Sequence, residues 1–174
     1  MNDVVKTILE RRSVRRFQPC GIDEAIVREI IECGRCAPNA WGRQTFGFHA
    51  ITDRKLMREL AELTAKYLGG VPEDHEFFSA PLIILISDIR ENYMRLADAG
   101  CAMENMFLAA KSYGVGSVWI NQLKGNCDDP GVREVLTSLG VPSDHIGFGT
   151  AALGYAASPA REMKKRPDAV VWAD

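Results

Sequence analysis

The chain has 174 residues, of which 47% are hydrophobic and 25% are charged, and its formal net charge is -2 at pH 7. This length and composition predict a single globular domain, residues 1–174, with a sizeable core. The near-neutral charge argues against general nucleic-acid binding, and no apolar run approaches the roughly 18 to 20 residues of a membrane span, so we expect a soluble cytoplasmic protein.

The first predicted helix begins near Asp3, which can serve as its N-terminal cap, as Asp23 and Asp53 can for the next two helices. It ends at the most unusual stretch of the chain. That stretch reads RRSVRRF at residues 11–17. Its guanidinium groups repel one another unless an anion lies among them, and Ser13 adds a hydroxyl donor. Because arginine binds phosphate through paired N–H donors, the segment indicates a phosphate site. The alternative is a solvated basic helix end.

A second amphipathic helix is predicted after Asp23, and it ends on the sequence CGRC. A Cys-x-x-Cys pair is typical of redox or metal sites when it opens a helix after a strand. Cys33 and Cys36 instead close a helix, and the five cysteines include no second pair at zinc-site spacing. We therefore favour reduced, structural thiols, with a redox or metal role as the alternative.

The middle of the chain predicts the core of a sheet and one long helix. A strand is expected over residues 46–52, a helix from Asp53 to about residue 68, and an exposed acidic loop over residues 69–76. The apolar run at residues 81–88 indicates a strand buried on both faces at the centre of the sheet. The helix expected over residues 92–113 has little purely polar face and needs partners on two sides. This predicts a homodimer; the alternative is a monomer with this helix buried centrally.

The last third predicts two more strands, at residues 115–120 and 147–155, with a short helix at residues 130–139 between them. Glycine in a strand, as in the second of these, often marks the close approach of a backbone or ligand. The chain then turns basic, and residues 170–172 could pair at a sheet edge. Two basic clusters at opposite ends of a near-neutral chain are expected to converge on one phosphate; a solvated basic tail is the alternative.

Four segments together resemble the FMN-dependent nitroreductase family. They are the basic stretch at residues 11–17, APNAWGRQ at 37–44, GVGSVWI at 114–120 and KKRP at 164–167. The resemblance implies an α+β fold, an α/β sandwich in which a central mixed, mainly antiparallel sheet is flanked by helices. It also implies an intertwined homodimer with FMN at the interface, in which residues 160–174 reach onto the partner.

The resemblance also assigns flavin contacts residue by residue. The implied cofactor-binding residues are Arg11, Arg12, Ser13, Arg15, Asn39, Gln44, Ile120, Asn121, Gln122, Lys164 and Arg166. Both basic clusters would surround the phosphate. Arg15 would lie near flavin N1 and O2, where a positive charge raises the flavin potential. Main-chain amides after the strand at residues 115–120 would point toward N5 and O4.

The chain shows no nucleophile, catalytic triad or metal site of its own, so a cofactor must carry the chemistry. The resemblance implies that FMN takes a hydride from NAD(P)H and reduces a small acceptor, such as a nitroaromatic or a quinone, in a ping-pong cycle. None of His49, His75 and His145 lies in a segment matched to the flavin site, so we expect no essential side-chain proton donor. The alternatives are a flavin carrier or sensor without turnover, and a thiol–disulfide protein using Cys33 and Cys36.

Overall fold

The computed structural model describes residues 1–68, 76–123, 125–164 and 170–172. Within these ranges the helices are α1 (Asp3–Glu10), α2 (Glu24–Arg35), α3 (Arg54–Leu68), α4 (Arg95–Ser112) and α5 (Pro130–Ser138). The strands are β1 (Gly47–Ile51), β2 (Leu82–Ile89), β3 (Gly116–Ile120) and β4 (His145–Gly154). Two single 3-10 turns, η1 (Ala40–Gly42) and η3 (Phe77–Ser79), precede β1 and β2. Apart from the edge pairing considered for residues 170–172, each helix and strand expected from the sequence is present, with ends shifted by a few residues.

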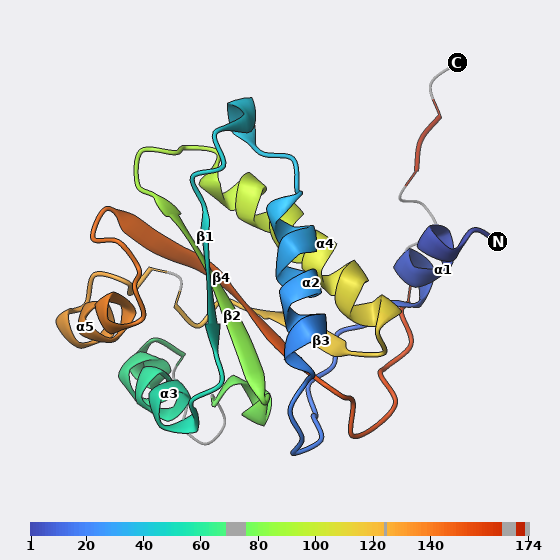
Figure 1. The fold of residues 1–174 in the computed structure, drawn as a ribbon, viewed down its shortest axis with the longest axis horizontal. Coiled ribbons are helices and arrows are strands. Elements are labelled where there is room, and N and C mark those ends of the chain that lie inside the picture. The colour runs from blue at the N-terminus through green and yellow to red at the C-terminus, as the bar shows by residue number, and fades with distance from the viewer. Residues whose placement is uncertain (69–75, 124, 165–169, 173–174) are drawn as a thin grey trace.

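The four strands form one antiparallel sheet in the order β1-β2-β4-β3 (Figure 1). β2 and β4 are the central strands, and every residue of β2 except Ile89 is buried. The prediction of a strand buried on both faces is therefore confirmed. The sheet was expected to be mixed, but within the described chain the parallel pairing consists of a single isolated bridge between Ser13 and Ser117.

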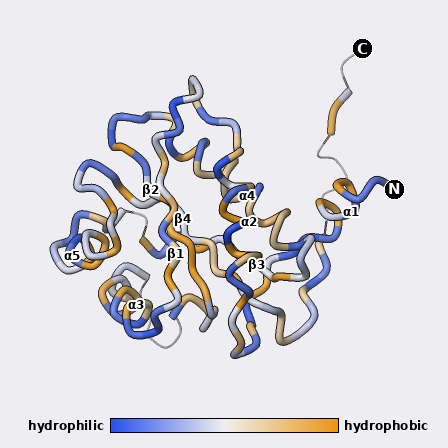
Figure 2. Tube along the Cα trace, in the orientation of Figure 1, coloured by the Kyte–Doolittle hydropathy of each residue, from blue (hydrophilic) through white to orange (hydrophobic). Residues whose placement is uncertain are grey.

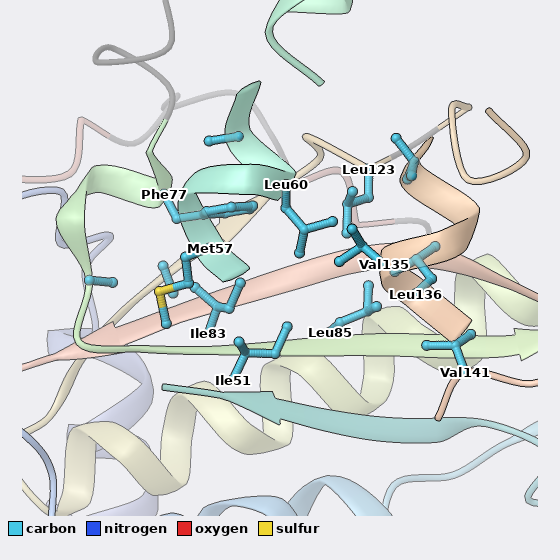
Figure 3. Packing of buried hydrophobic residues seen from close by; sticks show 14 of the residues in the cluster. Ile51, Met57, Leu60, Phe77, Ile83, Leu85, Leu123, Val135, Leu136 and Val141 are labelled. Atoms are coloured by element: carbon cyan, nitrogen blue, oxygen red, sulfur yellow. The ribbon is translucent and has the colours of Figure 1, made fainter. Parts of the chain in front are cut away.

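Helices cover both faces of the sheet, so the fold is the expected α+β sandwich (Figure 1). On one face, Leu60 of α3 and Leu136 of α5 pack over Ile83 and Leu85 of β2 (Figure 3). The hydrophobic residues gather along the central strands and on the helix sides that face them (Figure 2).

The opposite face of the sheet is covered by α2 and α4, which pack against each other. Met103 and Met106 of α4 lie over Ile84 and Ile86 of β2, and α2 contributes Ile30 to the same cluster. Alternate side chains of one central strand thus supply two separate cores, as the pleat of a strand requires. None of the helices in the described ranges is long and apolar enough to cross a membrane.

α1 lies outside both cores and exposes its apolar side chains. No residue of α1 is buried, although Val4, Val5, Ile8 and Leu9 are apolar. α1 and the end of the chain project from the body of the molecule (Figure 1). Residues 170–172 are also exposed and form no strand in the single chain, so the expected pairing at a sheet edge is wrong there.

The predicted helix caps are correct at two of three positions. Asp23 and Asp53 each accept a hydrogen bond at 2.8 Å, from the N–H of Ala25 and of Lys55. Asp3 is itself the first helical residue, and Asn2 caps α1 instead. Both side chains belong to the strong capping class, so the sequence alone left a one-residue ambiguity.

Candidate functional site

The basic segment at residues 11–17 runs beside β3 at the edge of the sheet. The Val14 N–H donates to the Ser117 carbonyl (3.0 Å), and Phe17 forms a bridge with Ala156. Val14 is buried because it packs on Gly116, where an added Cβ would lie 2.7 Å from Val14 Cγ2. Neighbouring side chains of an extended segment point to opposite sides, so Ser13 and its second neighbour Arg15 remain exposed.

Two arginines of this segment already have partners. The Nε atom of Arg11 lies 3.3 Å from a carboxylate oxygen of Glu104, and its guanidinium lies 5.9 Å from the centre of the Phe107 ring. Arg12 donates from Nη1 to the carbonyls of Leu9 (2.7 Å) and Arg11 (2.6 Å). Arg12 therefore satisfies carbonyl groups at the C-terminal end of α1, where a cation is favoured.

The other two arginines face a cavity of about 540 Å³. Its polar lining comprises Arg15, Arg16, Arg161, Ser13 and Ser158. A smaller cavity of about 180 Å³ adjoins it, lined in part by Arg11, Arg12 and Lys111, and the two share Val14 and Ala160. The structure thus gathers the four predicted flavin contacts of the N-terminal cluster, Arg11, Arg12, Ser13 and Arg15, around two neighbouring cavities.

The C-terminal basic stretch approaches the same place. Arg161 lines the larger cavity beside Arg15 and Arg16. Lys164 is exposed and does not line either cavity, while Arg166 lies outside the described residues. Sequence reasoning did not assign Arg16 or Arg161 to a site, although both belong to the basic clusters that it singled out.

The aromatic wall of the larger cavity comes from the turn η3. Phe77 is fully buried, whereas its neighbour Phe78 faces the cavity, and the Arg15 guanidinium lies 6.0 Å from the centre of the Phe78 ring. Phe77, Phe78 and Ser79 have φ angles of 50°, 56° and 53°, in the left-handed region that non-glycine residues rarely adopt. Nothing in the sequence signals this backbone conformation.

The loop predicted to contact the flavin is held by its own hydrogen bonds. Asn39 accepts at Oδ1 from the N–H of Gln44 (2.9 Å) and donates from Nδ2 to the Ala37 carbonyl (3.3 Å). Gln44 has a φ of 51°, and Trp41 in η1 has a φ of 56°. The loop is therefore a fixed, strained turn.

A buried polar network ties this loop to α4. The Ala40 N–H donates to Asp98 Oδ1 (3.0 Å), and Asn92 donates from Nδ2 to Asp98 Oδ2 (2.9 Å) and to Asp88 Oδ2 (2.8 Å). Asp88, Asn92 and Asp98 are all buried. Outside the network, Trp41 packs edge-on against Tyr93, with ring centres 5.4 Å apart. The sequence analysis did not identify this network, because its link to the loop joins Ala40 and Asp98, which are 58 positions apart.

The loop and the basic segment contact different ends of α4. η1 is bound to Asp98 near the start of the helix, while α1 and the segment that follows it pair with Glu104 and Lys111. From Asp98 to Lys111 the helix axis extends for about 20 Å. Within one chain, Asn39 and Gln44 line neither of the two cavities beside Arg11 and Arg15.

The residues after β3, which were predicted to contact the flavin, lie at a third place in the fold, separate from the basic segment and from the loop with η1. Ile120 ends the strand opposite Thr150, and Asn121 accepts at Oδ1 from the indole N–H of Trp119 (2.7 Å). The Gln122 side chain is buried and donates to the Thr64 hydroxyl (2.9 Å), so it is directed toward α3. Only the main chain of Gln122 remains available for the expected contact with flavin N5 and O4.

The histidines and cysteines set aside in the sequence analysis lie elsewhere. His49 and His145 share the buried Ser87 hydroxyl, each with a ring nitrogen 3.0 Å from Oγ. His75 lies outside the described residues. Burial, with added effects from Cys36 and nearby glutamates, raises the pKa of the Cys33 thiol. A raised pKa disfavours the reactive thiolate, but Cys33 and Cys36 are both exposed, so the expectation of small buried structural thiols is wrong for this pair.

Comparisons with known proteins agree with the fold and with the motif order. The profile of the nitroreductase family matches residues 8–155. A crystal structure of an FMN-bound nitroreductase from Bacteroides fragilis is 33% identical, covers 100% of both chains and superposes with a TM-score of 0.92.

Two more distant proteins extend this agreement. An FMN reductase (NADPH) from Bacillus subtilis is 27% identical over 189 residues, which cover 99% of this chain and 73% of that protein. An FMN-bound nitroreductase from Desulfitobacterium hafniense, 22% identical over 100% of both chains with a TM-score of 0.90, supports the fold alone. The chain belongs to the nitroreductase family.

Proposed function

We propose that this protein is an FMN-dependent oxidoreductase that uses NAD(P)H to reduce a small acceptor such as a nitroaromatic or a quinone. One observation carries the proposal: arginines from both ends of the chain line a cavity of about 540 Å³ in a fold shared with an FMN-bound nitroreductase. The names of related proteins, among them an NADPH-flavin oxidoreductase from Vibrio harveyi, support the same donor and cofactor.

The residues around the cavities fit an FMN phosphate. A phosphate group needs charge-assisted donors, and the site offers Arg11 and Arg12 in the small cavity with Ser13 in the large one. Lys164 and Arg166 remain proposed ligands from the C-terminal stretch. When bound, FMN would accept a hydride from NAD(P)H and pass electrons to the acceptor.

The roles of the protein groups are binding and electrostatic tuning. Arg15 places a fixed positive charge in the cavity wall, which would favour electron uptake by a ring beside it. The main chain of Ile120, Asn121 and Gln122 would supply hydrogen-bond donors to the ring. His49 and His145 are engaged with Ser87 away from both cavities, so we propose that protons come from water and that the cycle is ping-pong.

A homodimer would complete the site. Asn39 and Gln44 lie too far from the cavities of their own chain, but the partner's copy of this loop would reach them if two α4 helices pack together. Exposed apolar residues on α1 and at residues 170–172 offer surface for the partner, and residues 160–174 would lie on it. Sedimentation of the FMN-loaded protein at low concentration tests this, and a stable monomer that keeps its flavin would contradict it.

The cofactor is tested on the purified protein. Its absorption spectrum should show a bound flavin, and denaturation followed by chromatography should release one FMN per chain. Finding only FAD, or no affinity for added FMN, would overturn the proposal.

Turnover is tested separately by adding NADPH or NADH without oxygen. Bleaching of the flavin absorbance, followed by recovery when a quinone is added, is the expected result. A flavin that binds but is not reduced by either donor would favour the carrier or sensor alternative. A cytoplasmic location remains a prediction.

A further inference from the structure

The basic residues near the two cavities differ in whether they have partners. Arg11 pairs with Glu104 and Lys111 pairs with Glu10, at 3.3 Å and 3.6 Å. Arg12 is bound to the end of α1 through two carbonyls.

The three arginines of the larger cavity have no such partner. Within the described ranges, no ion pair involves Arg15, Arg16 or Arg161. The described residues that line this cavity include no aspartate or glutamate. The hydroxyl-bearing residues Ser13 and Ser158 also line it. Its lining is therefore suited to an oxyanion.

The positive charge exceeds what one flavin phosphate would neutralise. Six basic side chains line the two cavities, and two of these, Arg11 and Lys111, are balanced by carboxylates. Four positive charges remain, whereas a phosphate monoester carries about two negative charges at pH 7. About two positive charges are thus left over, and Arg16 and Arg161 are the cavity residues that the proposed flavin contacts do not use.

The turn η3 adds an aromatic surface to this charged cavity. Three consecutive residues, Phe77, Phe78 and Ser79, have φ angles in the left-handed region, which is strained for non-glycine residues. Arg54 clamps the turn by donating to the carbonyls of Ser79 (3.1 Å) and Ala80 (3.0 Å). The strained turn presents Phe78 to the cavity while Phe77 anchors it in the core.

From these observations we propose that Arg16 and Arg161 form an anion subsite for the substrate that reacts with the flavin, a planar molecule bearing a carboxylate or phosphate, with Phe78 against its ring. The inference rests on the proposed function. Two sources of the anion fit this chemistry. It could be an acid group on an aromatic acceptor, or the extra phosphate that distinguishes NADPH from NADH.

The test uses the FMN-loaded protein and the variants Arg16→Gln and Arg161→Gln, with Arg28→Gln as the control. Arg28 is an exposed arginine on α2 paired with Glu24, so its variant removes the same charge elsewhere. The acceptor arm compares 4-nitrobenzoate with the neutral 4-nitrobenzamide. The donor arm compares NADPH with NADH.

We expect each cavity variant to raise KM either for 4-nitrobenzoate or for NADPH by about three- to tenfold, as for a charge-assisted contact at a partly exposed site. KM for the neutral member (or for NADH) and the FMN dissociation constant should stay within about twofold. A rise for 4-nitrobenzoate assigns the subsite to the acceptor, and a rise for NADPH assigns it to the donor.

Equal changes for both members of each pair, or no change in either pair, would overturn the proposal. A large loss of FMN affinity in these variants would also overturn it, because the arginines would then belong to the flavin phosphate. If the parent protein binds no FMN, the proposed function fails. Calorimetric binding of 4-nitrobenzoate to the parent and to Arg161→Gln then decides the subsite, and no difference between the two rejects it.

Discussion

The polar groups around the two ends of α4 differ in burial and in hydrogen bonding. Near its start, Asp98 and Asn92 are buried and hydrogen-bonded to each other and to the η1 turn. Beyond its end, Arg15, Arg16 and Arg161 face a cavity and have no carboxylate partner in the described chain. A buried polar group must find its partner within the protein, whereas an exposed cation can keep its water. The first arrangement fixes a loop, and the second leaves charge available for a ligand.

The largest expected effect comes from breaking the buried network. Asp98→Ala removes the acceptor for the partly buried Ala40 N–H and for one N–H of the buried Asn92 amide, whose other N–H still donates to Asp88. We expect the free energy of unfolding to fall by about 2 to 4 kcal/mol, as for the loss of a buried charged acceptor. Urea unfolding at one protein concentration measures it.

The matched control lies on the same helix. Glu104→Ala removes a half-exposed carboxylate and should change the free energy of unfolding by less than about 1 kcal/mol. If the two variants lost similar stability, burial would not be what distinguishes the two ends of α4.

The basic end should respond in ligand affinity more than in stability. Arg11→Ala removes a guanidinium from the wall of the small cavity and should weaken FMN binding by about 1.5 to 3 kcal/mol, the usual range for hydrogen bonds to charged groups. Fluorescence titration of the apoprotein with FMN measures it. Arg35→Ala, within the CGRC segment and paired with Glu32, removes a charge that lines neither cavity and should bind FMN normally. A loss of affinity equal to that of Arg11→Ala would indicate a general charge effect and no specific site.

The anchoring of the basic segment can be disturbed without touching an arginine. A methyl group on Gly116 would lie 2.7 Å from Val14, so Gly116→Ala should cost about 1 to 3 kcal/mol of stability and displace the segment. FMN affinity should fall as well. Combining Gly116→Ala with Val14→Gly removes all three of the crowding Val14 atoms, including Cβ at 2.9 Å, and should recover part of that affinity. Additive losses in the double variant would show that the segment is not positioned by this contact.

The smallest expected effect concerns the pH dependence of stability, because His49 is a polar side chain that can change its charge. Burial lowers the pKa of His49, against the opposing effect of its hydrogen bond with the Leu139 carbonyl, from a usual value of 6.5. The unfolded chain therefore takes up a proton at a higher pH than the folded chain does. This contribution to stability is fully present above about pH 6.5 and is lost as the pH falls toward the lowered pKa.

Melting temperatures of the parent and of His49→Gln between pH 7.5 and 5.5 measure this effect. The parent should lose more stability on acidification than the variant does. Parallel curves for the two proteins would show that His49 does not contribute to the pH dependence.

Much of the fold could be predicted because its signals are local. The apolar run of β2, the capping residues Asp23 and Asp53, and the long apolar pattern of α4 each act within a few residues, and each matches the structure. The one misplaced cap, Asn2 in place of Asp3, reflects two neighbouring residues of equal capping ability. The predicted sheet-edge pairing of residues 170–172 was wrong for the single chain, because a β-favouring run forms a strand only where a sheet edge is available to it.

The types of residue in the candidate site could be predicted from the sequence, but their arrangement could be predicted only in part. The sequence by itself predicted a phosphate site formed by basic residues from both ends of the chain, because repulsion between neighbouring arginines is a local property. Only the tertiary structure decided which arginines keep their charge available. Arg11 is brought to Glu104, 93 positions away, while Arg16 and Arg161 meet at one cavity beside a strained turn. Such pairings depend on how helices and strands pack, and contacts between distant segments leave no periodic or compositional signal in the chain.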